Sequence, residues 1–155
     1  LDGREREIQT EIQATLQRAK VNDPETAAVP IETRCKLAEL YWELVYQGLV
    51  EGELMSFCLE QVLLHAHAVL KGDRGRPRMA LLAGRASLMR RRFDHARPMF
   101  EEAIRRGLSI SVVGPYLAEV EYELRRPDEV RRFVSGFAES ARLRPNLASI
   151  VERWT

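Results

Sequence analysis

The spacing of apolar side chains along this chain is that of amphipathic helices from one end to the other. Apolar residues recur every three or four positions in one segment after another, and no run alternates polar and apolar residues over the length of a strand. Proline and glycine punctuate these segments where helices start and stop. The expected fold class is therefore all-α. Helices are predicted over residues 4–20, 32–48, 53–71, 77–90, 94–106, 112–125, 128–143 and 146–154.

The first predicted helix carries only a narrow apolar stripe. Ile8, Ile12 and Leu16 lie on one face, and the rest of the segment is strongly charged. Such a stripe either packs along the domain or pairs with another chain. Ile8, Ile12 and Leu16 are therefore also candidate contacts of a homodimer.

The domain organisation follows from these segments. Residues 1–22 form the N-terminal amphipathic helix, residues 23–31 contain two prolines and form a linker, and residues 32–155 form one helical domain. Within that domain the apolar pattern repeats after a shift of 34 residues, as from Ala96 to Val130. This repeat predicts stacked helix pairs, since one pair alone cannot bury its apolar face. A generic helical bundle with helices of equal length is the alternative.

The segment 77–110 resembles a tetratricopeptide repeat (TPR). The residues that support the resemblance are Ala83, Gly84, Phe93, Ala96, Phe100 and Ala103. Gly84 and Ala96 are small enough to let two helices of a pair approach closely, and Phe100 would fill the space between successive pairs. The flanking units match less well. The resemblance implies a right-handed superhelical stack of about three antiparallel helix pairs, with an extra N-terminal helix.

Charge is balanced overall but unevenly distributed. The chain has 24 basic and 23 acidic side chains, and a net charge of +1 gives no general attraction to nucleic acid. Residues 1–70 carry 6 basic and 12 acidic side chains, whereas residues 74–106 carry 10 arginines and 3 acidic side chains. This arginine block either attracts an acidic partner or is neutralised by neighbouring helices. Its two clusters lie too far apart on a helix for a compact phosphate-binding surface.

No arrangement of catalytic or metal-binding residues stands out. His65 and His67 point to different faces of a helix, and no phosphate-binding glycine loop is present. Cys35 and Cys58 are expected at opposite ends of an antiparallel helix pair, beyond the reach of a disulfide, and are interpreted as free thiols. The expectation is a non-enzymatic protein with no catalytic residue, no metal site and no cofactor.

Protein binding is the remaining interpretation. In the repeats that residues 77–110 resemble, the first helix of each pair lines a groove for a partner's helix or extended segment. Arginines there would suit carboxylates of an acidic partner, and methionine and tyrosine would suit apolar contacts. The lysine and asparagine with which co-chaperones of the family clamp a C-terminal carboxylate are absent. The predicted groove residues are Arg78, Leu81, Arg85, Met89, Tyr116, Glu119 and Tyr122.

The resemblance implies a scaffold or adaptor in a bacterial multiprotein assembly, such as a secretion or polysaccharide-export apparatus. A secretion chaperone of the same repeat class, holding a client segment, is the second hypothesis. Regulatory or nucleic-acid binding through residues 74–106 is the third. Free thiols and the lack of an apolar run of about 18 residues favour the cytoplasm. Because the chain begins at Leu1 rather than Met, an anchor upstream of Leu1 would make it the cytosolic part of a membrane protein.

Overall fold

The computed structural model describes residues 2–20 and 28–133. Residues 127–133 are helical, and the described ranges contain no strand, so the all-α prediction is confirmed. The predicted helix 146–154, the predicted helix 128–143 beyond residue 133 and most of the predicted linker 23–31 lie outside the described residues. The longer helices are α1 (Asp2–Arg18), α2 (Ile31–Tyr46), α3 (Gly52–Gly72), α4 (Pro77–Met89), α5 (Phe93–Arg105) and α6 (Ile110–Glu123).

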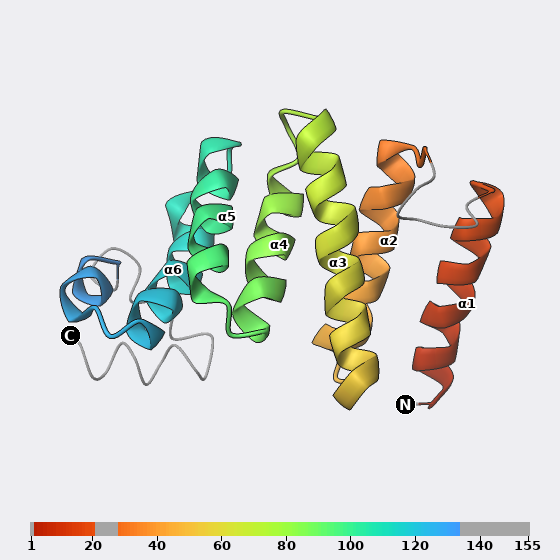
Figure 1. Cartoon of the computed structure of the whole chain (residues 1–155), viewed down its shortest axis with the longest axis horizontal. Helices are drawn as coiled ribbons and strands as arrows, with labels where there is room; N and C mark the ends of the chain where they lie inside the picture. The colour runs from red at the N-terminus through yellow and green to blue at the C-terminus, as the bar shows by residue number, and fades with distance from the viewer. Residues whose placement is uncertain (1, 21–27, 134–155) are drawn as a thin grey trace.

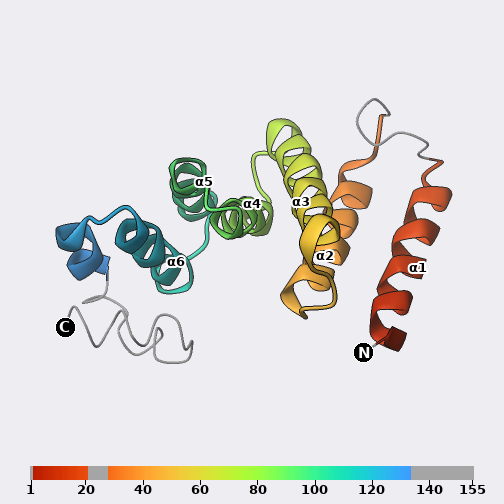
Figure 2. The ribbon, with the colours of Figure 1, turned by 60° about the horizontal axis from the view of Figure 1, so that its bottom comes forward.

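The helices lie side by side in a row that follows their order in the chain (Figure 1). Each helix packs against the next one, and in addition α2 contacts α4 and α4 contacts α6. The view in Figure 2, turned by 60°, keeps the same order along the row. Because α2, α4 and α6 touch one after the other, they form a continuous face of the molecule.

The helix boundaries agree with the predicted ones to within two residues, and proline or glycine stands at several of them. Pro77 opens α4, where its missing N–H would have no helical partner in any case. Gly107 follows α5 with a φ angle of +123°, which is strained for any residue with a side chain. The turn between α4 and α5 differs, because it contains neither residue and instead places Arg91 at a φ angle of +59°.

Helix α1 packs against α2 through its apolar stripe. Ile8 and Ile12 are buried, Leu16 packs against the same core, and Glu11 forms an ion pair with Lys36 of α2. Of the two sequence alternatives, packing within the chain is the one observed. The homodimer contact suggested for Ile8, Ile12 and Leu16 stays a prediction, and within this chain Ile8 and Ile12 are buried while Leu16 is partly buried against the same core.

Helices α4 and α5 meet at Gly84, as the sequence predicts. A Cβ atom at Gly84 would lie 2.5 Å from Cε1 and 2.6 Å from Cδ1 of Phe100, so the phenyl ring rests on the glycine backbone. Phe100 is fully buried, and its ring also stacks on Tyr116 of α6 at a centroid distance of 5.5 Å. Ala96 and Ala103 of the same helix are fully buried as well. Phe100 thus joins α4, α5 and α6.

The side chain of Arg106 connects the C-terminal end of α3 to the C-terminal end of α5 through hydrogen bonds. Its guanidinium donates hydrogen bonds to the carboxylate of Glu102 and to the backbone oxygens of Leu70, Asp73 and Gly75. The last carbonyl groups of a helix have no partner within it, so a charged donor from another helix replaces the missing hydrogen bonds. Arg106 therefore fixes the turn between α3 and α4 against α5.

Replacing Arg106 with glutamine is expected to lower the free energy of unfolding by about 2 kcal/mol, because backbone oxygens lose a charged donor in a half-buried setting. Arg105 is the matched control, since it binds the same Glu102 carboxylate but its side chain is 63% exposed, against 14% for Arg106. For Arg105→Gln the expected loss is much smaller, because water screens an exposed ion pair and its contribution to stability is slight. Denaturant titration of both variants measures the difference. Equal losses would contradict the role given to Arg106.

Candidate partner-binding groove

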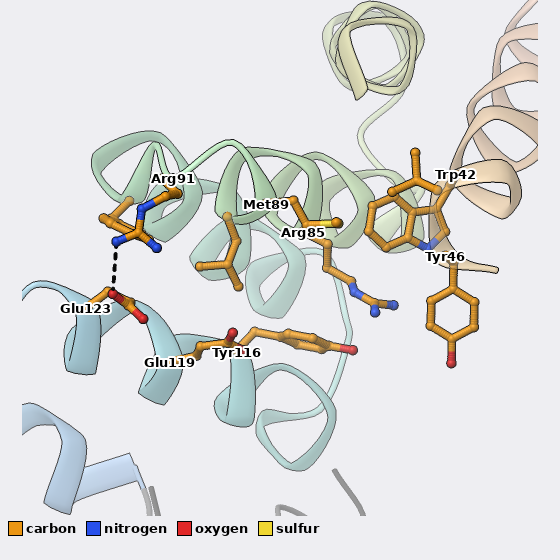
Figure 3. A pocket seen from close by; sticks show the side chains of 11 residues that line it. Trp42, Tyr46, Arg85, Met89, Arg91, Tyr116, Glu119 and Glu123 are labelled. Carbon is orange, nitrogen blue, oxygen red and sulfur yellow. Dashed lines mark hydrogen bonds and ion pairs between the residues drawn. The ribbon is translucent and has the colours of Figure 1, made fainter. Parts of the chain in front are cut away.

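A groove of about 290 Å³ lies on the face formed by α2, α4 and α6 (Figure 3). Its lining combines aromatic and aliphatic side chains with two arginines and two glutamates. Tyr46 and Met89, at the ends of α2 and α4, are two large apolar side chains left exposed there. An exposed apolar surface rimmed by charged groups is typical of a binding site.

Arg85 of α4 lies among three aromatic rings in this groove. Its guanidinium carbon is 4.7 Å from the ring centroid of Trp42, 5.3 Å from that of Tyr46 and 4.9 Å from that of Tyr116. Trp42 and Tyr46 stand one turn apart on α2, whereas Tyr116 comes from α6. Cation–π attraction therefore holds Arg85 between the helices on either side of its own.

Two carboxylates lie along the α6 side of the groove. Glu123 forms an ion pair with Arg91 at 3.4 Å, and Glu119 stands one turn earlier on α6. In Figure 3 the guanidinium of Arg85 lies toward α2, while both glutamates lie toward the opposite end. The groove is therefore polarised, with a cation near α2 and carboxylates near the end of α6.

The structure brings together four of the seven predicted groove residues. The groove is lined by Arg85, Met89, Tyr116 and Glu119. These residues come from α4 and α6, which are the first helices of the two predicted pairs. Their proximity follows from the direct contact between α4 and α6.

The other three predicted residues lie elsewhere. Leu81 is buried and packs in a core cluster with Phe100 and Tyr116, so its expected place on the groove is wrong. Arg78 binds Glu39 of α2 at 2.8 Å and does not line the groove. Tyr122 is half-buried on α6, also outside the groove lining. The buried side chains of the described residues form two apolar clusters, and α4 contributes to both of them. More of the surface of α4 is therefore covered than its single apolar stripe suggests.

Trp42 and Tyr46 are groove residues that the sequence analysis did not select. The sequence places them at the flank of the apolar stripe of α2, and that stripe accounts for the packing of the helix. Their spacing of four is a signal that could have identified them, because aromatic residues four apart share a helix face. Nothing in the sequence pairs that face with Arg85.

Carboxylates of other helices neutralise much of the arginine block 74–106. Arg76 pairs with Glu32, Arg78 with Glu39, Arg90 with Glu60 and Arg97 with Glu121. The first three of these carboxylates belong to the acidic N-terminal part of the chain. Between the two sequence alternatives for this block, the contacts favour neutralisation by neighbouring helices.

Both thiols are free, and burial keeps them protonated. Burial raises the pKa of Cys58 to about 11, and burial also raises the pKa of Cys35. A protonated thiol is a weak nucleophile and a weak metal ligand. Within the described residues, no group of three or more histidine, cysteine or acidic side chains is placed to hold a metal ion.

Comparison with family models, with curated proteins and with solved structures gives no match to this chain. Among the described helices, none is long and apolar enough to cross a lipid bilayer. The interpretation of the groove therefore depends on its own residues and on the helices that position them.

Proposed function

We propose that this chain is a non-enzymatic protein-interaction module that holds a helix or an extended segment of a partner protein in the groove between α2, α4 and α6. The observation that carries the proposal is the composition of the groove. Tryptophan, tyrosine, methionine and arginine are the residues that protein interfaces favour, and here they meet in one hollow. Tyr46 and Met89 give a partner exposed apolar surface to cover.

The proposal takes the helices as units of a TPR-like, right-handed superhelical stack. The close packing of Gly84 on Phe100 supports it, as do the contacts of α4 with α2 and α6. A role as scaffold or adaptor in a bacterial assembly, such as a secretion or export apparatus, follows by analogy with that repeat class. A secretion chaperone would use the same groove for an unfolded client.

Nucleic-acid binding through residues 74–106 has less support. A phosphate-binding surface needs several arginines free to contact the backbone of the nucleic acid on one face. Arg78, Arg90 and Arg97 each pair with a carboxylate of another helix. Binding would have to break these ion pairs first.

The test is selection of peptides from a displayed random library on the full chain. In Met89→Glu, the dissociation constant of the selected peptides is expected to rise about tenfold or more, because a buried apolar contact is replaced by a charge. Leu54→Glu is the matched control. Leu54 of α3 is 44% exposed and Met89 is 46% exposed, but Leu54 does not line the groove.

Selected peptides should bind Leu54→Glu as tightly as they bind the unchanged protein. Peptides that bind Met89→Glu equally well would show that the groove is not the binding surface. A selection that yields no peptide above background would count against the proposed function as a whole.

A further inference from the structure

We propose that the chain has a second binding site, separate from the groove, that takes a primary carboxamide such as the side chain of asparagine or glutamine. The site is a pocket of about 360 Å³ between α5, α6 and the helical residues 127–133. The described residues that line it are not those that line the groove. Two of its side chains, Arg97 and Glu121, supply the donor and the acceptor that bind the carboxamide.

The carboxylate of Glu121 uses only one of its two oxygens. The side chain of Glu121 is 4% exposed on α6, and its Oε1 accepts a hydrogen bond from Nε of Arg97 at 2.6 Å. Its Oε2 is buried and accepts no hydrogen bond from the described part of the chain. Buried polar atoms in folded proteins almost always have a partner. The Oε2 of Glu121 is therefore an acceptor to which a ligand can supply the donor.

The guanidinium of Arg97 shows the converse. Its Nη2 is buried and has no acceptor among the described residues, although its Nε is engaged. Arginine and a carboxylate often pair through two parallel hydrogen bonds, whereas this pair forms one of the two. Nη2 is bonded to the same carbon as Nε, and Oε2 to the same carbon as Oε1. A donor and an acceptor thus flank a single hydrogen bond inside the pocket.

A primary carboxamide matches this donor and acceptor. It has an N–H and a C=O on the same edge, so the N–H can donate to Oε2 of Glu121 while the C=O accepts from Nη2 of Arg97. A trans peptide group points its N–H and C=O in opposite directions. The side chain of asparagine or glutamine therefore fits this site better than a partner's backbone does.

The charges of the pocket favour such a neutral ligand. The described lining contains three arginines and three glutamates. A ligand carboxylate is repelled by the oxygen of Glu121, and a ligand cation is repelled by the guanidinium of Arg97. Each ion would also lose its hydration without gaining a full set of partners. A carboxamide forms both hydrogen bonds and leaves the balance of charge unchanged.

The ligand reaches Glu121 beside Arg126. The Nη1 of Arg126 lies 3.6 Å from Oε2 of Glu121, and the side chain of Arg126 is 51% exposed. A half-exposed ion pair at this distance contributes little to stability. The guanidinium of Arg126 can therefore turn toward solvent, and the N–H of the ligand then takes its place at Oε2.

The experiment compares small molecules of one shape on the ¹⁵N-labelled full chain. Acetamide, acetate and acetamidinium have the same size but offer a donor with an acceptor, two acceptors and two donors. In nuclear magnetic resonance titrations at constant ionic strength, acetamide should shift the Nε–H signal of Arg97 with a dissociation constant of about 1–100 mM, as expected for so small a ligand. N,N-dimethylacetamide keeps the C=O but has no N–H, and it should bind about tenfold more weakly.

Protein variants locate the binding. In Glu121→Gln the dissociation constant of acetamide should rise about tenfold, because an NH₂ group can occupy the place of the acceptor. Asp128→Asn is the matched control. Asp128 is an exposed carboxylate close to the pocket in the sequence but outside its lining, so its change should leave acetamide binding unaltered. Thermal unfolding of both variants shows whether the fold is kept, and the comparison of ligands needs no variant at all.

Two further ligands distinguish the source of the carboxamide. Tighter binding of N-acetylglutamine N-methylamide than of free glutamine assigns the site to a side chain of a partner protein, and the reverse order assigns it to a free metabolite. Equal binding of acetamide and N,N-dimethylacetamide would overturn the inference, as would stronger binding of acetate or acetamidinium. Absence of any shift at Arg97 and Glu121 would show that solvent alone occupies the pocket.

Discussion

Phe100→Ala is expected to lower the free energy of unfolding by about 3–5 kcal/mol, the range for removing a large aromatic side chain from a well-packed core. Phe100 is fully buried, rests on Gly84 of α4 and stacks on Tyr116 of α6. Its removal leaves a cavity where three helices meet, and none of them can close it without moving. Denaturant unfolding followed by circular dichroism measures the loss.

Phe57→Ala is the control for this prediction. Phe57 lies on α3, its side chain is exposed, and its ring meets that of Tyr41 at a centroid distance of 6.0 Å. A loss of at most about 1.5 kcal/mol is expected there. Similar losses in Phe57→Ala and Phe100→Ala would contradict the central place of Phe100.

Gly84 tests the same contact from the other helix. Gly84→Ala should be destabilising by about 1–3 kcal/mol, because the added Cβ overlaps the ring of Phe100. In a Phe100→Ala background the same change should cost nothing, since alanine favours a helix over glycine by about 1 kcal/mol and the ring is gone. Additive effects of the two changes would show that these residues do not touch.

The second large effect is a loss of stability on mild acidification, caused by His65 of α3. The His65 side chain is fully buried, its ring is parallel to that of Tyr41, and its Nδ1 lies 3.2 Å from Nη1 of Arg34. Arginine can only donate, so Nδ1 accepts and the neutral imidazole has its proton on Nε2. Burial, followed by the charge of Arg34, lowers the pKa of His65 to about 4.

The sign of the effect follows from the direction of this shift. Between pH 6.5 and pH 4 the unfolded chain binds a proton at His65 that the folded chain does not bind, so acid favours unfolding. The stabilisation is complete above pH 6.5 and is lost as the pH falls toward 4. From pH 7 to pH 4.5, the free energy of unfolding should fall by about 2.5 kcal/mol on account of this residue.

The measurement is denaturant unfolding at several values of pH between 4.5 and 7. His65→Gln should lose most of the pH dependence, and a smaller slope should remain because burial and the charge of Lys71 also lower the pKa of His67. An unchanged slope in His65→Gln would exclude His65 as its origin.

Much of the fold is predictable because it depends on local residues. Pro77 and Gly107 mark helix ends through their backbone chemistry, which needs no knowledge of the rest of the chain. Gly84 and Phe100 could be paired because they follow the pattern of a known repeat. The apolar stripe of α1 predicted that one face of this helix would be buried. The sequence left open whether that face would pack against this chain or against another chain.

The parts that could not be predicted depend on several helices at once. Leu81 was expected on the surface because the spacing of residues along α4 does not show how many other helices pack against it. Arg106 belongs to a basic cluster in the sequence, and only the fold places it at the end of α3. Trp42 and Arg85 are distant in the chain, and their contact exists only because α2 touches α4.

Packing among the described helices reaches no further than the second neighbour along the chain, so no contact between α1 and α6 closes the row. A force that pulls the two ends of such a row of helices apart acts on each helix–helix interface in turn. The small displacements at the individual interfaces then add up along the row. The hollow between α2 and α6 spans more than one of these interfaces. Its width is therefore expected to change under mechanical tension on the molecule, and the proposed binding of a partner segment would change with it.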